Sequence, residues 1–171
     1  MDDALRLAQE WGERGPVGQV DDIAEEAGYS KGAVYSNFAG KRELALAVNG
    51  EIYNHRELKA ELQQPYAFQT GSDCEVINAL YVEDQPASFL NRLNGIFAFA
   101  LWDKAKGRGI IARDPIGVCP LYWGHDSQGR LRVASEMKSL SEQCADVAQF
   151  PPGHWYDSAT GELTRYYERP W

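Results

Sequence analysis

The pattern of hydrophobic and polar positions changes near residue 48. Before that point apolar residues recur at a helical spacing, as in Ala4, Leu7, Ala8 and Trp11, which is typical of short amphipathic helices. Glycines separate these segments and stand where helices are expected to end. The pattern predicts helices over residues 2–11, 21–27, 31–38 and 41–48.

From residue 49 onward the pattern is mixed. Helical spacing recurs over residues 56–62 and 74–81, and Asp73 stands where it can cap the second of these helices. Apolar runs separated by turn sequences then predict strands over 96–102, 109–113, 117–123 and 131–135, and a final hairpin over 154–156 and 163–167. This part of the chain therefore predicts an α+β arrangement.

The composition of the 171 residues, 44% hydrophobic and 25% charged, suits one medium domain or two smaller ones and excludes a disordered or fibrous chain. The longest apolar run, Ile96 to Trp102, is far shorter than the roughly 20 residues of a membrane helix, so we expect no membrane association. No basic segment followed by an apolar stretch opens the sequence. We therefore expect no signal peptide and a cytoplasmic location.

The three cysteines, Cys74, Cys119 and Cys144, have no CxxC spacing, and the three histidines are scattered. We therefore expect no disulfide framework, no metal site and no cofactor. Cys74 falls on a predicted helix, Cys119 on a predicted strand and Cys144 in a loop. We expect all three to pack as small apolar residues, since a reactive thiol needs an activating neighbour.

The segment from Val20 to Tyr35 has the form of a DNA-reading helix-turn-helix, two short helices joined by a Gly-containing turn. The sequence resembles the N-terminal DNA-binding domain of the TetR family, with matches at Asp22-Ile23-Ala24, Ala27-Gly28, Ser30-Lys31-Gly32, Tyr35, Asn37-Phe38, Lys41 and Leu44. The resemblance implies a recognition helix over residues 31–37 and DNA contacts from Lys31, Tyr35 and Lys41.

The charge balance leaves two functions open for this segment. Residues 1–48 hold nine Asp and Glu against five Lys and Arg, and the whole chain has a net charge of -8. DNA binding draws much of its affinity from phosphate neutralisation, and the large helical domain typical of the TetR family does not follow. The segment is therefore either a DNA-binding element or a small helical cap that touches no DNA.

A second set of motifs extends over the rest of the chain. Its members are Asn49-Gly50-Glu51, Thr70-Gly71-Ser72-Asp73, and the segments 93–100, 112–122, 134–140 and 150–153. From about residue 46 to 171 the sequence resembles the glutamine-hydrolysing domain of the asparagine synthetase B family. The resemblance implies a class II N-terminal-nucleophile hydrolase fold, an αββα sandwich of antiparallel sheets, here without its N-terminal part. The expected organisation is a TetR-like helix-turn-helix segment over 1–48 and a glutamine amidotransferase domain over 49–171, with an α+β fold class.

Glutamine hydrolysis in this family needs a thiol at the mature N-terminus, donors that stabilise an oxyanion, and groups that hold the substrate α-amine. The resemblance implies that Asn49 (side-chain amide) and Gly50 (backbone N–H) form the oxyanion hole. It also implies that L-glutamine is bound by Glu51, Gly71, Ser72 and Asp73.

The sequence begins Met1-Asp2, and the family's nucleophile, its carboxylate-clamping Arg and its ATP-dependent synthetase domain are not found in it. We therefore expect the chain to bind L-glutamine weakly and to be inactive alone. Two alternatives stay open. One is a TetR-type transcription regulator whose C-terminal part senses an amino acid, and the other is an inert chain with neither activity.

The junction from Leu44 to Val48 fits two local structures, the end of a TetR-type helix or the strand that leads into Asn49-Gly50-Glu51. One backbone segment cannot be both, because helix and strand project side chains with different periods. The chain is therefore either a real fusion or an artificial join at this shared segment. We favour the join, because a sandwich without its first strands leaves sheet edges uncovered.

Overall fold

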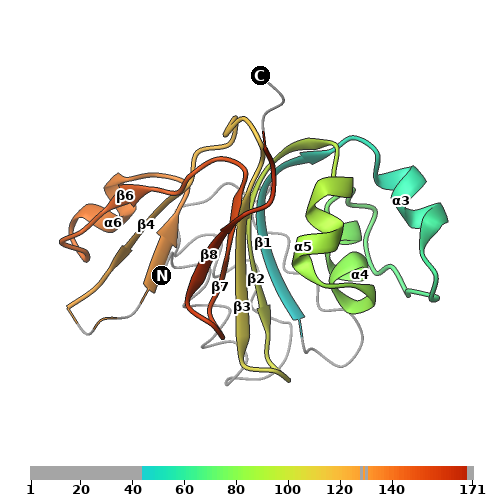
Figure 1. Cartoon of the computed structure of the whole chain (residues 1–171), viewed down its shortest axis with the longest axis horizontal. Coiled ribbons are helices and arrows are strands. Elements are labelled where there is room, and N and C mark those ends of the chain that lie inside the picture. The colour runs from blue at the N-terminus through green and yellow to red at the C-terminus, as the bar shows by residue number, and fades with distance from the viewer. Residues whose placement is uncertain (1–43, 128, 130, 169–171) are drawn as a thin grey trace.

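The computed structural model describes residues 44–127, 129 and 131–168. Within them, two antiparallel sheets lie against each other, with helices covering the larger sheet and one short helix on the smaller sheet (Figure 1). The helix-turn-helix expected before residue 44 lies outside the described residues.

The larger sheet has the strand order β1-β2-β3-β7-β8, and each neighbouring pair is antiparallel. Its strands are β1 (Leu44–Ile52), β2 (Gly95–Asp103), β3 (Arg108–Arg113), β7 (His154–Asp157) and β8 (Glu162–Arg165). The pairing of β1 with β2 runs from Leu44 opposite Asp103 to Ile52 opposite Gly95. Among the described strands, β1 therefore forms one edge of this sheet.

Three helices and a 3-10 turn connect β1 to β2. They are α3 (His55–Glu61), α4 (Glu75–Glu83), α5 (Pro86–Phe89) and the turn at Leu90–Arg92. Every residue of α4 from Glu75 to Tyr81 is buried, and its apolar side chains pack on the larger sheet. The helices predicted over 56–62 and 74–81 are confirmed.

The alternation of side chains along β2 separates two hydrophobic cores. Phe97, Phe99 and Leu101 lie in the core shared with α4 and α5. Ala98 and Ala100 lie in the core between the two sheets. Both phenylalanines of β2 face the helices, so the core between the sheets takes its aromatic rings from other elements.

Trp123, Phe150 and Tyr156 supply these rings, with Trp123 edge-on to both of the others. Trp123 belongs to the smaller sheet, whose order is β5-β4-β6, formed by β4 (Tyr122–His125), β5 (Leu131–Ala134) and β6 (Ala148–Gln149). The short helix α6 (Lys138–Ser141) packs Leu140 into a third small core with Ala134. The sequence of layers is the αββα arrangement that the resemblance implied, and the α+β fold class is confirmed.

The junction from Leu44 to Val48 is strand, so the helix predicted over 41–48 is wrong for these residues. Leu44, Leu46 and Val48 alternate into the core beneath α4. A strand places them on one face, whereas a helix would spread them around its axis. β1 also runs without a break from this junction into Asn49-Gly50-Glu51.

The strand predicted over 117–123 is also wrong in its first half, because β4 begins only at Tyr122. The carboxylate of Asp114 accepts hydrogen bonds from the backbone amides of residues 116–119. These amides are therefore used by a turn, and Cys119 lies in a loop, buried. No helix of the described residues is long and apolar enough to cross a membrane.

Candidate functional site

The second half of β1 carries the residues expected to form an oxyanion hole. Side chains at Leu46, Val48 and Ile52 face the helices, so the alternation of the strand directs Asn49 and Glu51 to the opposite face of the sheet. Both are exposed. The structure thus places an amide and a carboxylate two residues apart on one open surface.

Gly50 lies between them and can only be glycine. Its φ is +131°, and a Cβ at this position would lie 2.0 Å from the carbonyl oxygen of Ile96 on β2. Because β2 approaches so closely, any side chain would force the two strands apart. Gly50 therefore gives the strand a backbone conformation that other residues cannot adopt here.

The loop before α4 reaches the edge of β1 that the described sheet leaves unpaired. The Asp73 carboxylate accepts a hydrogen bond of 2.6 Å from the backbone amide of Ile52. The Cys74 thiol lies 3.6 Å from the Gly50 carbonyl oxygen, to which it donates a weak hydrogen bond. These contacts join two motifs that are more than 20 residues apart.

Asp73 does not cap α4, contrary to the prediction, since the N-terminus of this helix has no side-chain cap. Its carboxylate turns to β1 instead. Ser72 is half-buried and accepts a hydrogen bond of 3.2 Å from the Cys74 amide, while Gly71 is exposed. The structure thus brings Asp73 to Ile52, next to Glu51 in the strand, and places Gly71 and Ser72 in the turn that leads to it.

One polar residue of this region was missed by the sequence analysis. Glu75, in the first turn of α4, has no exposed surface. Its carboxylate accepts hydrogen bonds from the backbone amides of Gln69 and Thr70 and from the Thr70 hydroxyl, at 2.6–2.8 Å. The only signal in the sequence was an acidic residue next to the apolar Val76 and Ile77, which also fits an exposed first turn.

None of the three cysteines has the environment of a nucleophile. Burial, and then the charge of Asp73, raise the pKa of Cys74 to about 12. Burial also raises the pKa of Cys119 and of Cys144. Since the thiolate is the reacting species, all three are poor nucleophiles near neutral pH. Within the described ranges, no group of three or more His, Cys, Asp or Glu side chains could hold a metal ion.

Arg113 and Asp114 stabilise the strand β2, on which the candidate site rests. The buried Arg113 guanidinium donates to the carbonyl oxygens of Gly117, Cys119 and Phe150 at 2.7–2.8 Å. The Asp114 carboxylate accepts from the Phe97 amide at 3.3 Å, and the Phe97 carbonyl accepts from the Asp114 amide at 2.8 Å. Because Phe97 is the cross-strand partner of Gly50, this pair holds the strand on which the site rests.

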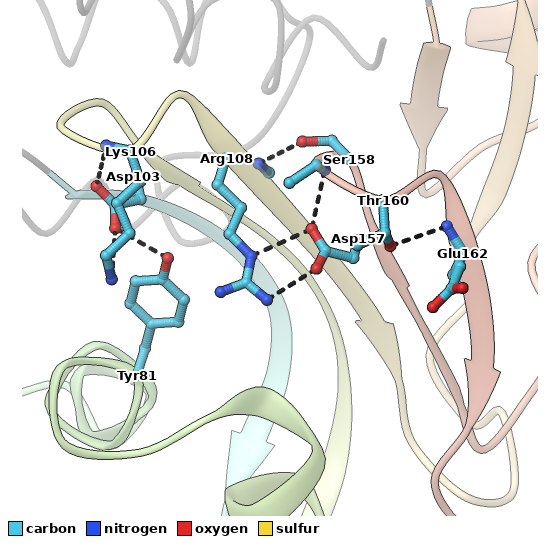
Figure 2. A network of polar contacts seen from close by, with 10 residues as sticks. Tyr81, Asp103, Lys106, Arg108, Asp157, Ser158, Thr160 and Glu162 are labelled. Carbon is cyan, nitrogen blue, oxygen red and sulfur yellow. Dashed lines mark hydrogen bonds and ion pairs between the residues drawn. The ribbon is translucent and has the colours of Figure 1, made fainter.

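A separate polar network lies at the other end of the larger sheet (Figure 2). Arg108 forms a bidentate pair with the buried Asp157, at 2.8 and 3.1 Å. Tyr81 donates to the buried Asp103 at 2.9 Å, and Lys106 lies 3.2 Å from the same carboxylate. Asp103 is opposite Leu44, at the far end of β1 from Gly50. Since these charges neutralise one another, the network is structural.

The comparisons with known proteins agree with this geometry. The family described as "Glutamine amidotransferase domain" matches residues 35–142, and the chain belongs to this family. The family described as "Bacterial regulatory proteins, tetR family" matches residues 4–48. The two matches overlap over 35–48, and the described part of that overlap is the first half of β1.

Several relatives are glutamine-hydrolysing asparagine synthetases. Asparagine synthetase B (glutamine-hydrolyzing) of Escherichia coli (strain K12) is 55% identical over 126 residues, which is 74% of this chain and 23% of that protein. The asparagine synthetase of Zea mays is 51% identical over 130 residues, 76% of this chain and 22% of that protein. The chain therefore spans less than a quarter of the length of these relatives.

Solved structures show the same fold. A glutamine phosphoribosylpyrophosphate amidotransferase from B. subtilis, complexed with ADP and GMP, has a TM-score of 0.67 at 28% identity. The matched region covers 82% of this chain and 34% of the amidotransferase chain. A glutamine aminotransferase class-II domain protein from Silicibacter pomeroyi has a TM-score of 0.56 at 14% identity and covers 89% of this chain and 83% of its own.

Proposed function

We propose that the chain forms the amine-binding and oxyanion side of an L-glutamine site. The observation that supports this most directly is the 2.6 Å contact between Asp73 and the Ile52 amide, which brings a carboxylate from a distant loop to the residue that follows Asn49–Glu51 in the strand. Two carboxylates, Asp73 and Glu51, would then attract the α-ammonium group of an amino acid.

The remaining residues of the motif suit the other end of the ligand. The Asn49 side-chain amide and the Gly50 backbone amide are hydrogen-bond donors, and donors of this kind hold the carbonyl oxygen of an amide substrate. Gly71 and Ser72 contribute the turn that presents Asp73. A ligand with an α-amine and a side-chain carboxamide, L-glutamine, satisfies both groups.

We propose further that this chain binds glutamine without hydrolysing it. Hydrolysis requires an activated nucleophile, whereas the three cysteines of the sequence are buried and have raised pKa values. Ammonia release that depends on the chain would contradict this proposal.

The test is calorimetric titration of the chain with L-glutamine, compared with D-glutamine, L-glutamate and glutaramate, which lacks the α-amine. We expect weak binding of L-glutamine and weaker binding of the others. Asp73→Asn keeps an acceptor for the Ile52 amide but loses the charge, so it should lower the affinity for L-glutamine between about tenfold and a hundredfold. Glu57→Gln, an exposed residue of α3, is the matched control. No detectable binding at roughly 10 mM ligand would refute the proposal.

A second candidate function rests on the tetR family match over residues 4–48. We propose a DNA-binding segment that ends before β1, with Lys31, Tyr35 and Lys41 as contact residues and the amidotransferase part beginning at Leu44. Fluorescence anisotropy with labelled duplex DNA tests it, since Lys31→Ala should reduce binding and the dependence on salt. If the unmodified chain and Lys31→Ala bound the DNA equally well at every salt concentration, a contact between Lys31 and DNA would be excluded.

A further inference from the structure

Glu75 holds the connection between α3 and α4 at the point where it approaches the candidate site. Its side chain is completely buried. The Oε1 atom accepts from the Gln69 amide at 2.6 Å, and Oε2 accepts from the Thr70 amide and hydroxyl at 2.8 Å each. Three donors from two consecutive residues therefore converge on one carboxylate that α4 fixes in the core.

The contacts continue from Thr70 toward Asp73. The Thr70 hydroxyl oxygen accepts from the Ser72 amide at 3.1 Å, and the Ser72 hydroxyl accepts from the Cys74 amide at 3.2 Å. Asp73 lies between Ser72 and Cys74 in the sequence, and its carboxylate accepts a hydrogen bond from the Ile52 amide on β1. The path of the loop from residue 69 to 73 is thus set by a chain of hydrogen bonds that begins at Glu75.

We propose that Glu75 is a positioning residue for amine recognition: it fixes the 69–73 loop so that Asp73 faces the Gly50–Ile52 segment, without touching the ligand itself. This inference rests on the proposed glutamine site and names a residue through which its selectivity is set. Only the amine end of the ligand depends on this loop. The Asn49 and Gly50 donors belong to β1 and are held by β2.

The informative variant is Glu75→Gln, which keeps the size of the side chain but replaces one acceptor oxygen by a donor NH2 group. Both carboxylate oxygens accept hydrogen bonds from backbone amides. The NH2 group of a glutamine side chain cannot accept one, so one of these backbone amides must lose its acceptor. The loop then loses a fixed end while the core keeps its volume.

Glu83 supplies a matched control on the same helix. It lies at the last position of α4, and its carboxylate accepts from the backbone amides of Gln63 and Gln64, at the other end of the same connection. Glu83→Gln therefore makes the same chemical change on the same helix, but at a contact where one oxygen accepts both amides, so the glutamine can keep it.

The experiment measures the affinities of the full chain for L-glutamine and for glutaramate, together with hydrogen exchange at the amides of Gln69 and Thr70. Glu75→Gln should lower the affinity for L-glutamine by about tenfold or more and leave that for glutaramate within roughly twofold. Exchange at both amides should accelerate. Glu83→Gln should change neither affinity. A purely structural role of Glu75 would lower both affinities together.

Each outcome distinguishes this inference from the proposed function. If the unmodified chain binds no glutamine, the proposed function fails. If the unmodified chain binds glutamine and Glu75→Gln binds it equally well, the inference alone is wrong. Should Glu75→Gln lose its cooperative melting transition, Thr70→Val provides the test, because it removes the hydroxyl between Glu75 and Ser72 while the Glu75 carboxylate keeps both backbone amide donors. It should weaken L-glutamine binding several-fold, and unchanged binding would overturn the inference.

Discussion

The Asp73 carboxylate accepts a hydrogen bond from the Ile52 backbone amide at 2.6 Å. This contact ties the start of α4 to the edge strand β1 and places a negative charge beside the Gly50–Glu51 segment. The candidate site is therefore assembled from one strand and one loop, and each part has its own support. Phe97 and Asp114 hold the strand, and Glu75 holds the loop.

Replacing Gly50 by alanine is expected to be severely destabilising. The new Cβ would lie 2.0 Å from the Ile96 carbonyl oxygen in a backbone with φ of +131°. We expect a loss of about 3–5 kcal/mol in the free energy of unfolding, measured by urea denaturation. Gly161→Ala is the control, since Gly161 also has a positive φ but nothing within 4 Å. It should cost only about 1–2 kcal/mol, and equal losses for both variants would show that the clash with β2 does not matter.

The Arg108–Asp157 pair predicts how stability depends on pH. Burial acts to raise the pKa of Asp157, but the hydrogen bonds from Arg108 and the Ala159 amide outweigh it, and the pKa is lowered overall. A lowered pKa in the folded state stabilises the protein above the unfolded value of about 3.9, and this contribution is lost as the pH falls through the folded value.

Asp157→Asn should therefore flatten the acid side of the stability curve. Near neutral pH it should cost about 3–5 kcal/mol, because Arg108 loses its buried partner. Thermal melts from about pH 3, below the unfolded pKa of Asp157, to about pH 7, well above it, measure both effects. The exposed Glu162→Gln serves as control. An unchanged acid slope in Asp157→Asn would mean that another carboxylate governs acid unfolding.

Cys74 is expected to resist alkylation in the folded chain. A pKa of about 12, against an ordinary value of about 8.5, leaves a thiolate fraction roughly a thousandfold smaller at pH 8. Iodoacetamide labelling followed by mass spectrometry should modify Cys74 only after denaturation. An electrophilic glutamine analogue should also leave it unmodified. Stoichiometric labelling of Cys74 in the native chain would show that this thiol is available as a nucleophile.

Arg113→Lys should lower stability although the charge is kept. The guanidinium donates to three carbonyl oxygens, and an ammonium group cannot reproduce this planar geometry. We expect a cost of about 2–4 kcal/mol in urea denaturation. Arg165→Lys, at an exposed position with one such bond to Tyr167, is the comparison and should be nearly neutral. A small effect of both would mean that the 114–119 loop is stable without Arg113.

The resemblance to glutamine-hydrolysing domains predicted the layers of the fold, because the motif residues and the apolar runs both lie in the elements that form the cores. Periodicity alone was ambiguous over Leu44–Val48, where Ala and Leu suit a helix. Only the cross-strand pairing with β2, which depends on residues about 50 positions away, makes this segment a strand. The elements β6 and α6 were not predicted, because they have too few residues to show a period.

The candidate site was predicted by its motifs but not by its contacts. Asp73 matched the rule for a helix cap and forms a long-range contact instead. Glu75 gave no distinctive signal, because an acidic first turn usually faces solvent. The Asp73 side chain turns to β1, which becomes a neighbour only after folding, whereas the Glu75 side chain turns to Gln69 and Thr70 in the preceding loop. The prediction of separate segments at residue 48 stays a prediction, since residues 1–43 lie outside the described part.

The two ends of β2 lie in different surroundings. At Asp103 the strand ends in a carboxylate that accepts a hydrogen bond from Tyr81 and pairs with Lys106. Near Phe97 the strand faces Asn49 to Glu51, whose side chains contribute nothing to the core. Exchanging Asn49 or Glu51 should therefore change which small molecule the proposed site binds and leave the melting temperature nearly unchanged, because both side chains are exposed. Stability and ligand preference are therefore separable at these two exposed positions, whereas at the buried Glu75 they are coupled.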